Sequence, residues 1–256
     1  MNALPRAAGH AQNIIGRARA AGVSAKVIGG VGCWFHSSEH SADAESFARN
    51  YGDVDLVLGR KEALAVSQVL EDLGYQPVSS FNSVQGEARL MFVDVEQNLR
   101  IDIFVGAFEM CHNIPLGEEA FHPAEHPALG LVELLLTKLQ IVKCNEKDFM
   151  DIGALLAFHA IGDGPDDIDG ERFARILARD WGLWRTVTDN LAKVEGWAAK
   201  APARSREIVE RAQEMRALVD AAPKSRRWKT RSMVGDKVRW YEEPEEPETE
   251  TEPEIR

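Results

Sequence analysis

The chain has 256 residues, of which 45% are hydrophobic and 28% are charged, which is ordinary for a globular protein with one large or two small cores. No apolar run approaches the roughly 18 residues of a membrane-spanning helix, and the first residues lack the apolar centre of a secretory signal. We therefore expect a cytoplasmic protein with no membrane partner. The net charge of −11 is concentrated in residues 242–256, which hold eight Glu and one Arg, so the rest of the chain carries only −4. Such a mildly acidic body neither indicates nor excludes a nucleic-acid partner.

The first half of the chain shows helical and strand-like periods in turn. The clearest strand is 53–58 (DVDLVL), where Val54, Leu56 and Leu58 share one face and Asp53 and Asp55 the other. The other elements expected here are a helix at 7–21, a strand from 26 into Gly29-Gly30, helical turns at 31–36, a loop at 37–50, a helix at 60–73, a short strand at 75–80, and a hairpin of strands at 88–95 and 99–105.

After about residue 128 the pattern becomes helical. Helices are expected at 129–143, 145–160, 170–180, 182–199 and 203–221, with a Gly/Pro/Asp loop at 162–170. Residues 223–256 have the composition of a charged tail, basic at first and then too rich in Glu and Pro to pack. The predicted fold class is α+β: a small mixed β-sheet core flanked by helices over 1–127, a helical region over 128–222, and a tail over 223–256.

Three aspartates form the strongest candidate site. Asp53 and Asp55 stand two apart on a strand and point the same way, with Cα atoms about 6.5–7 Å apart. Asp102 lies mid-strand in LRIDIFV, where a carboxylate is costly unless it is paired or bound to metal. Two charges about 4 Å apart repel by about 4 kcal/mol at an effective dielectric of about 20, so converging carboxylates require a cation. Ligands that are all carboxylates favour Mg²⁺ or Mn²⁺.

A plainer interpretation of these aspartates stays open. Asp53 and Asp55 could lie on a solvated sheet face, and Asp102 could be neutralised by Arg100 or by a helix terminus. The glycine pair favours the metal site, because a strand that runs through Gly29-Gly30 into a helix exposes backbone N–H groups that can hold a phosphate. A lone glycine pair is weak evidence, but the order of glycine pair, Asp-x-Asp strand and later Asp strand is more specific.

The order VIGG…YGDVDLVL…RIDIFV resembles the nucleotidyltransferase superfamily typified by DNA polymerase beta and the antibiotic nucleotidyltransferases. Residues 133–156 are similar to the helical segment of the abortive-infection type of nucleotidyltransferase toxins. The resemblance implies a nucleotidyltransferase core in which Gly29 and Gly30 hold the phosphates of the nucleotide. It also implies that Asp53, Asp55 and Asp102 bind two metal ions, that Asp102 can act as a base, and that Lys138, Lys147, Asp148 and Asp151 match the helical segment.

The function expected from this resemblance is metal-dependent transfer of a nucleoside monophosphate from an NTP to a hydroxyl acceptor. Mg²⁺ or Mn²⁺ would be the cofactor, and the acceptor would be a small molecule, an RNA end or a protein. The alternative is a nucleotide-binding or interaction module that kept the fold and lost turnover. Two departures from the family pattern leave room for it: Gly30 stands where a Ser would contact phosphate, and the segment between Gly30 and Asp53 is long.

Lys138 has two interpretations, a phosphate contact or an exposed helix lysine. Asp148 and Asp151 share a helix face, and salt bridges with Lys143 or Lys147 are the simplest role for them. The basic stretch 224–239, with Trp228 and Trp240 nearby, could bind RNA phosphates with aromatic stacking, or could be clamped by the acidic run that follows. Tryptophans 181, 184 and 197 are expected to be core or interface residues.

Cysteine and histidine point to no further site. Cys33, Cys111 and Cys144 are odd in number and far apart, which argues against a disulfide framework and for a reducing compartment. We expect all three to be small core residues. His36 and His40 could share a helix face and bind zinc, but no Cys or His partner stands at ligand spacing, so zinc is not expected.

Overall fold

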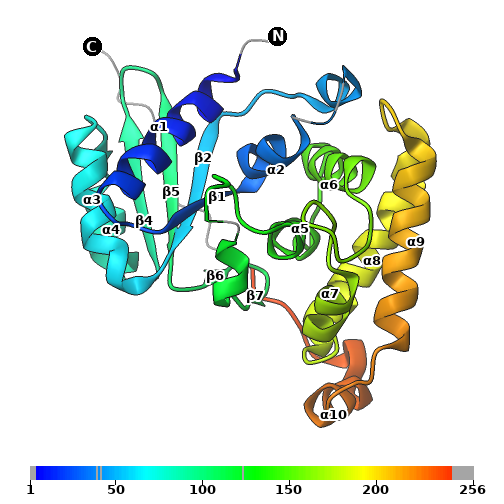
Figure 1. Cartoon of the computed structure of the whole chain (residues 1–256). Helices are drawn as coiled ribbons and strands as arrows, with labels where there is room; N and C mark the ends of the chain where they lie inside the picture. The colour runs from blue at the N-terminus through cyan, green and yellow to red at the C-terminus, as the bar shows by residue number, and fades with distance from the viewer. Residues whose placement is uncertain (1–3, 39, 41, 123, 244–256) are drawn as a thin grey trace, which may run out of the picture.

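The computed structural model describes residues 4–38, 40, 42–122 and 124–243, and its fold is α+β, as the sequence predicts (Figure 1). A mixed sheet lies on one side of the molecule and a group of helices on the other. The sheet runs in the order β1-β2-β5-β4-β3, with β2 and β5 parallel and the other neighbours antiparallel. Its strands are β1 (Ala25–Ile28), β2 (Asp53–Leu58), β3 (Gln76–Pro77), β4 (Arg89–Asp94) and β5 (Leu99–Val105).

One face of the sheet is covered by α1 (Arg6–Ala20) and α3 (Ala63–Asp72). The even-numbered side chains of β2 and the odd-numbered ones of β5 point to this face, as their alternation predicts, and are buried against Ile14 and Leu70. The hairpin of β4 and β5 is confirmed. The strand expected at 75–80 is confined to β3, an edge strand that ends at Pro77 before α4 (Ser79–Gln85) begins.

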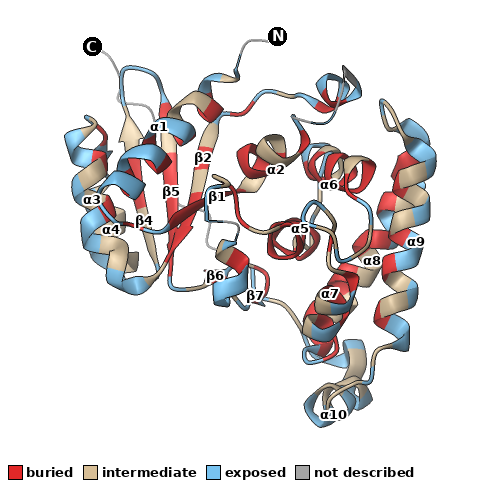
Figure 2. Ribbon diagram, in the orientation of Figure 1, coloured by how far each residue is buried: buried red, intermediate tan, exposed pale blue. Residues whose placement is uncertain are grey.

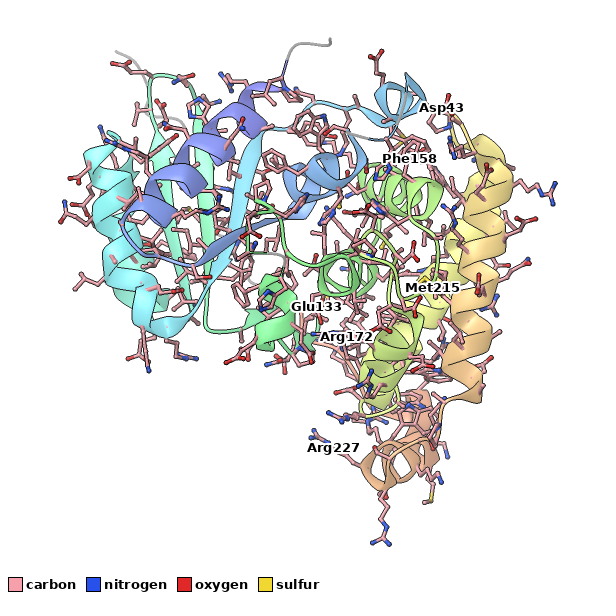
Figure 3. The ribbon with its side chains drawn as sticks, in the orientation of Figure 1. Asp43, Glu133, Phe158, Arg172, Met215 and Arg227 are labelled. Atoms are coloured by element: carbon pink, nitrogen blue, oxygen red, sulfur yellow. The ribbon has the colours of Figure 1, made fainter. Side chains whose placement is uncertain are left out.

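The opposite face of the sheet meets the helical half. Here α2 (Gly29–Ser37), α5 (Leu131–Leu139) and α6 (Glu146–Phe158) pack together, outside them lie α7 (Gly170–Leu177), α8 (Trp181–Trp197) and α9 (Ser205–Ala221), and all residues of α5 are buried (Figure 2). A largely apolar helix whose charged residues Glu133 and Lys138 have ion partners belongs at the centre of such a group. Arg172 of α7 and Glu133 of α5 form an ion pair at 2.6 Å, which joins two of these helices (Figure 3).

The chain differs from the predicted tail in residues 226–234, which form α10 (Arg226–Val234). Ser225 caps this helix by accepting a hydrogen bond from the Trp228 backbone N–H. The Trp228 ring meets Trp184 at 5.1 Å, and the Arg231 guanidinium lies 4.7 Å from the Trp181 ring. These aromatic contacts give a basic segment enough apolar surface to pack, which its charge obscured in the sequence. The Glu/Pro-rich part of the predicted tail, 244–256, lies outside the described residues.

Besides the packing of the sheet face against α2 and α5, two segments connect the halves through backbone hydrogen bonds. Residues 127–129 pair alongside the edge strand β1, since Val27 N–H donates to Pro127 O (2.9 Å) and Leu129 N–H donates to Val27 O (3.0 Å). After α10, Glu242 N–H donates to Cys111 O (3.0 Å), so the chain returns to the short ribbon of β6 (Phe108–Glu109) and β7 (Asn113–Ile114). Short 3₁₀ helices complete the fold at Ala42–Phe47, Arg60–Glu62, Glu118–Phe121, Ala198–Lys200 and Gly235–Lys237. Within the described ranges, no helix has the length and apolar character needed to cross a bilayer.

Candidate functional site

The parallel pairing of β2 with β5 brings the three aspartates together. Asp55 stands directly opposite Asp102 in this register, and Asp53 stands opposite Arg100. All three carboxylates leave the sheet on the face toward the helical half, because the other face is occupied by Val54, Leu56 and their neighbours. The sequence predicted the shared direction of Asp53 and Asp55, and the strand register adds Asp102 to them.

Asp55 has the least compensated charge of the three. It is partly buried, and no cation or hydrogen-bond donor pairs with its carboxylate in the part of the chain that the structure describes. Burial, together with the charges of Asp53 and Asp102, raises the pKa of Asp55 to about 7. The ionised form of such a carboxylate is stabilised by any cation that reaches it.

Asp102 is compensated by arginines. The guanidinium of Arg89, on β4, makes two bonds to the Asp102 carboxylate, Nε to Oδ1 and Nη2 to Oδ2, both at 2.8 Å. Arg100 lies between the strands, 3.5 Å from Asp102 Oδ2 and 3.3 Å from Asp53 Oδ2. Asp102 was expected to need a partner, and Arg100 was the candidate. The closer partner is Arg89, which the sequence analysis did not single out.

The glycine pair lies directly against the aspartates. Gly29 begins α2 with a φ of +64°, and a Cβ atom there would overlap the Asp55 carboxylate. A Cβ atom on Gly30 would overlap the guanidinium of Arg49. No side chain caps the start of α2 and no acidic residue lies in its first turn. Its free N–H groups and positive dipole end therefore stay available to an anion beside Asp55.

Lys138 is neither exposed nor free, which corrects one of its two interpretations. It is buried, with Nζ 2.8 Å from Asp151 Oδ2 and 3.6 Å from Asp148 Oδ1. Burial disfavours its charge, but Asp151, Cys33 and Asp148 outweigh that effect and raise the pKa of Lys138. The aspartates thus pair with Lys138 rather than with Lys143 or Lys147, because the partner comes from a neighbouring helix rather than from the next turn.

Arg49 is a site-lining residue that the sequence did not reveal. Its Nε and Nη2 bind the two carboxylate oxygens of Asp151 at 2.9 and 2.7 Å. Gly30 packs against both side chains, so this ion cluster of Arg49, Lys138, Asp148 and Asp151 supports the glycine turn from the helical side. The position of Arg49, four residues before Asp53, is a signal that could have been noticed.

Two surface cavities flank the carboxylates, although neither is lined by them. A cavity of about 590 Å³ is lined by Arg49, Tyr51 and Gly52, just before β2 begins. A second cavity, of about 470 Å³, is lined by Arg89 and Phe104, near the opposite end of the parallel strands β2 and β5. The second one therefore connects to Asp102 through Arg89.

The donors suit a hard divalent cation in part. Asp53 and Asp55 supply carboxylate oxygens without a strong competing partner, whereas both oxygens of Asp102 are taken by Arg89. Among residues 4–38, 40, 42–122 and 124–243, no three His, Cys, Asp or Glu side chains are already gathered closely enough to hold a metal ion. The carboxylates thus fit Mg²⁺ or Mn²⁺ through Asp53 and Asp55, and Arg89 competes with a cation for the oxygens of Asp102.

The histidines form a separate cluster at the far end of α2. The ring of His36 stacks on His126 at 4.0 Å and meets His159 edge-on at 5.7 Å, while His40 meets His159 at 4.6 Å. Burial, followed by the proximity of His126, lowers the pKa of His36 to about 3. Burial also lowers the pKa of His159 to about 4. The rings of His36 and His159 are thus held neutral by burial.

The three cysteines are free thiols. Cys33 and Cys111 are buried, as expected of small core residues, while Cys144 is only partly buried and its Sγ lies 3.0 Å from Ile141 O. Burial raises the pKa of the Cys144 thiol to about 12. Cys144 therefore lacks the lowered pKa of a reactive thiolate.

The arrangement combines three carboxylates on neighbouring strands, a glycine turn at an uncapped helix start and a buried ion cluster behind it. Chemically, such a site can hold a divalent cation and an anionic group together. No protein-family model, no curated protein and no solved structure matches this chain. The resemblance to nucleotidyltransferases therefore rests on the order and the placement of these residues alone.

Proposed function

We propose that this protein is a metal-dependent nucleotidyltransferase that moves a nucleoside monophosphate from an NTP to a hydroxyl acceptor. One observation carries the proposal: Asp55 lies opposite Asp102 on parallel strands, with Asp53 on the same face and Gly29 packed against Asp55. This places a cation site and an anion-binding helix start side by side. Both are needed to hold a metal-bound triphosphate.

Asp53, Asp55 and Asp102 are the residues that would hold Mg²⁺ or Mn²⁺. When bound, the ions neutralise the charge of the triphosphate and stabilise the attacking and leaving oxygens. Asp102 is the proposed acceptor of the proton from the acceptor hydroxyl. The excess of carboxylate charge over guanidinium charge at these strands supports the assignment of the three aspartates as cation ligands.

The N–H groups at Gly29 and Gly30 are the proposed phosphate contacts. Lys138 lies behind this turn, and its charge already acts on Asp55. Because Asp151 and Asp148 hold its ammonium group, its contribution to phosphate binding would be electrostatic unless it leaves them.

An RNA end is the acceptor that α10 supports. A cavity of about 340 Å³ is lined by Arg179, Arg227, Arg231, Trp181 and Trp240, which combines guanidinium groups with aromatic faces. Arg227 extends from α10, and it forms no ion pair with another described residue (Figure 3). Phosphate contacts by arginine and stacking on tryptophan are the general means of binding single-stranded RNA. Small-molecule and protein acceptors are tested alongside it.

A second function, nucleotide binding without turnover, is favoured by the bond pattern of Asp102. Arg89 occupies both oxygens of that carboxylate, as in a structural ion pair. In that case the glycine turn would still bind phosphate while the third ligand stays occupied.

The test is incubation of the full chain with each α-labelled NTP, Mg²⁺ or Mn²⁺, and separate RNA, protein and small-molecule pools. We expect label transfer to one pool, lost at least about a hundredfold in Asp55→Asn and retained in Asp72→Asn, which makes the same change on the exposed side of α3. Transfer that survives Asp55→Asn would contradict the metal assignment. Binding of NTP without transfer to any pool would favour the second function.

A further inference from the structure

Arg89 stands between the carboxylate site and an open cavity. Its guanidinium holds Asp102 through two bonds of 2.8 Å, the fork geometry that gives strong carboxylate pairing. Asp102 is 1% exposed, whereas the Arg89 side chain is 20% exposed. The arginine can therefore move without opening the core, while the aspartate cannot.

The sheet register explains how Arg89 reaches this position. Arg89 pairs with Phe104 across β4 and β5, and Met91 pairs with Asp102, so Arg89 contacts Asp102 along the diagonal on one face. Its guanidinium lies 5.0 Å from the Phe104 ring and 5.7 Å from the Phe81 ring. These aromatic faces stabilise a cation at the cavity entrance without fixing it to one carboxylate.

The cavity offers Arg89 a second set of partners. Its volume is about 470 Å³, and Glu109, Glu242 and Glu243 are among the residues that line it. An arginine released from Asp102 thus finds other carboxylates within the same cavity and does not lose all compensation for its charge. The cavity thus offers negative charge to the guanidinium on the side away from Asp102.

We propose that Arg89 is an exchangeable counter-ion: it neutralises Asp102 in the free protein and leaves it when a divalent cation binds. This inference rests on the proposed function, because it assumes a cation at Asp53 and Asp55. The fork of Arg89 and a cation compete for the same two oxygens, and their like charges repel at this distance. Cation binding therefore weakens the Arg89–Asp102 pair, and the pair weakens cation binding.

The chain provides matched controls for this competition. Arg60 lines the same cavity and carries the same charge, but forms no ion pair with a carboxylate in the described part of the chain. Its Nη1 donates instead to the carbonyl oxygen of Glu87 at 2.9 Å. Arg60→Gln therefore reports the effect of net charge, and Arg89→Lys keeps the charge while removing the fork.

The experiment measures Mn²⁺ binding to the full chain by electron paramagnetic resonance, without nucleotide. We expect Arg89→Gln to bind Mn²⁺ roughly tenfold more tightly than wild type, because one competing charge is removed from the ligand. Arg89→Lys should bind with intermediate affinity, Arg60→Gln should stay within about twofold of wild type, and Asp55→Asn should lose binding. Glutamine at 89 can still donate a hydrogen bond to the buried Asp102, which limits the loss of stability.

The outcomes separate the two proposals. Equal or weaker Mn²⁺ binding by Arg89→Gln, with binding by wild type intact, would overturn the role of Arg89 and leave the metal site standing. No Mn²⁺ binding by any of these proteins would overturn the proposed function itself. Should Arg89→Gln fail to fold, the Arg89 Nε–H resonance of the wild type decides: Mg²⁺ should shift it and expose it to solvent exchange, and an unchanged resonance at saturating Mg²⁺ would overturn the inference.

Discussion

Two groups of charges lie on either side of the Gly29-Gly30 turn, one buried and one partly exposed, and they differ in how well they are compensated. On the helical side, Asp148 and Asp151 meet Lys138 and Arg49, two carboxylates with two cations. On the sheet side, three carboxylates meet two guanidinium groups, and Asp55 is left without a partner among the described residues.

The difference assigns different roles to similar residues. A compensated cluster with short contacts stabilises the packing of helices, and removing one member leaves an unpaired buried charge. An undercompensated cluster costs stability in the free protein and recovers it when a cation binds. Substitution of Asp55 should therefore change stability with the opposite sign to substitution of Asp151.

The largest effect is expected from Asp151→Ala. It leaves the charges of Lys138 and Arg49 buried without their shared carboxylate, and we expect the free energy of unfolding to fall by about 3–5 kcal/mol. Urea denaturation measures it. The exposed Asp72→Ala serves as a control and should stay within about 0.5 kcal/mol of wild type. A loss below about 1 kcal/mol for Asp151→Ala would mean that the helical cluster is not structural.

Gly29→Ala tests how closely the turn approaches the sheet cluster. The positive φ alone costs about 1–2 kcal/mol, and overlap with Asp55 should bring the total to roughly 3 kcal/mol. Gly22→Ala is the matched control, since Gly22 has a φ of +76° but open space around its Cβ position. Thermal unfolding compares the two. Equal losses would show that Asp55 moves aside freely, and Asp55→Ala should rescue part of the Gly29→Ala loss.

Asp55→Asn should stabilise the protein in the presence of EDTA, by about 2 kcal/mol above pH 7. The pKa of Asp55 is raised to about 7, so ionised Asp55 disfavours the folded state at neutral pH. The gain should shrink as the pH falls toward about 4, because the wild-type group is then protonated in the folded protein. Denaturant midpoints at several pH values measure this. Destabilisation at pH 8 would contradict the undercompensated state of the sheet cluster.

The smallest effect concerns His36, whose imidazole is buried in the neutral form rather than in an ion pair. The pKa of His36 is about 3 in the folded protein against about 6.5 unfolded, so the unfolded chain binds more protons as the pH falls. Wild type should therefore lose about 1 kcal/mol relative to His36→Gln between pH 7 and pH 5.5. His122→Gln, in an exposed position, should keep the wild-type profile. Identical profiles for wild type and His36→Gln would show that His36 is not held neutral.

Much of the fold follows from local periodicity, and much of the site does not. Alternation in DVDLVL and LRIDIFV placed Asp53, Asp55 and Asp102 on strands and gave their faces. The parallel register that sets Asp55 against Asp102 joins distant segments, so no local pattern determines it.

The ion-pair partners were the part of the site that the sequence predicted least well. Asp148 and Asp151 were expected to pair with Lys143 or Lys147, which are close in sequence, whereas tertiary packing brings Lys138 and Arg49 to Asp151. The contact between Arg89 and Asp102 could have been predicted more easily. The short turn between β4 and β5 fixes the strand pairing, and this pairing places Arg89 diagonally opposite Asp102. Helix α10 was not predicted, because its many Lys and Arg residues gave the segment the composition of a charged tail, and its aromatic contacts come from distant parts of the chain.

The hydrogen bond from Glu242 to Cys111 has a consequence for the synthesis of the protein. The ribosome makes the β6–β7 ribbon long before residue 242, so this bond closes only when nearly the whole described chain has emerged. Until then the two halves are held by residues 127–129 and by the packing of the sheet face against α2 and α5, without this last contact. A nascent chain stalled before α10 should therefore be cleaved by protease more readily between its halves than the finished protein.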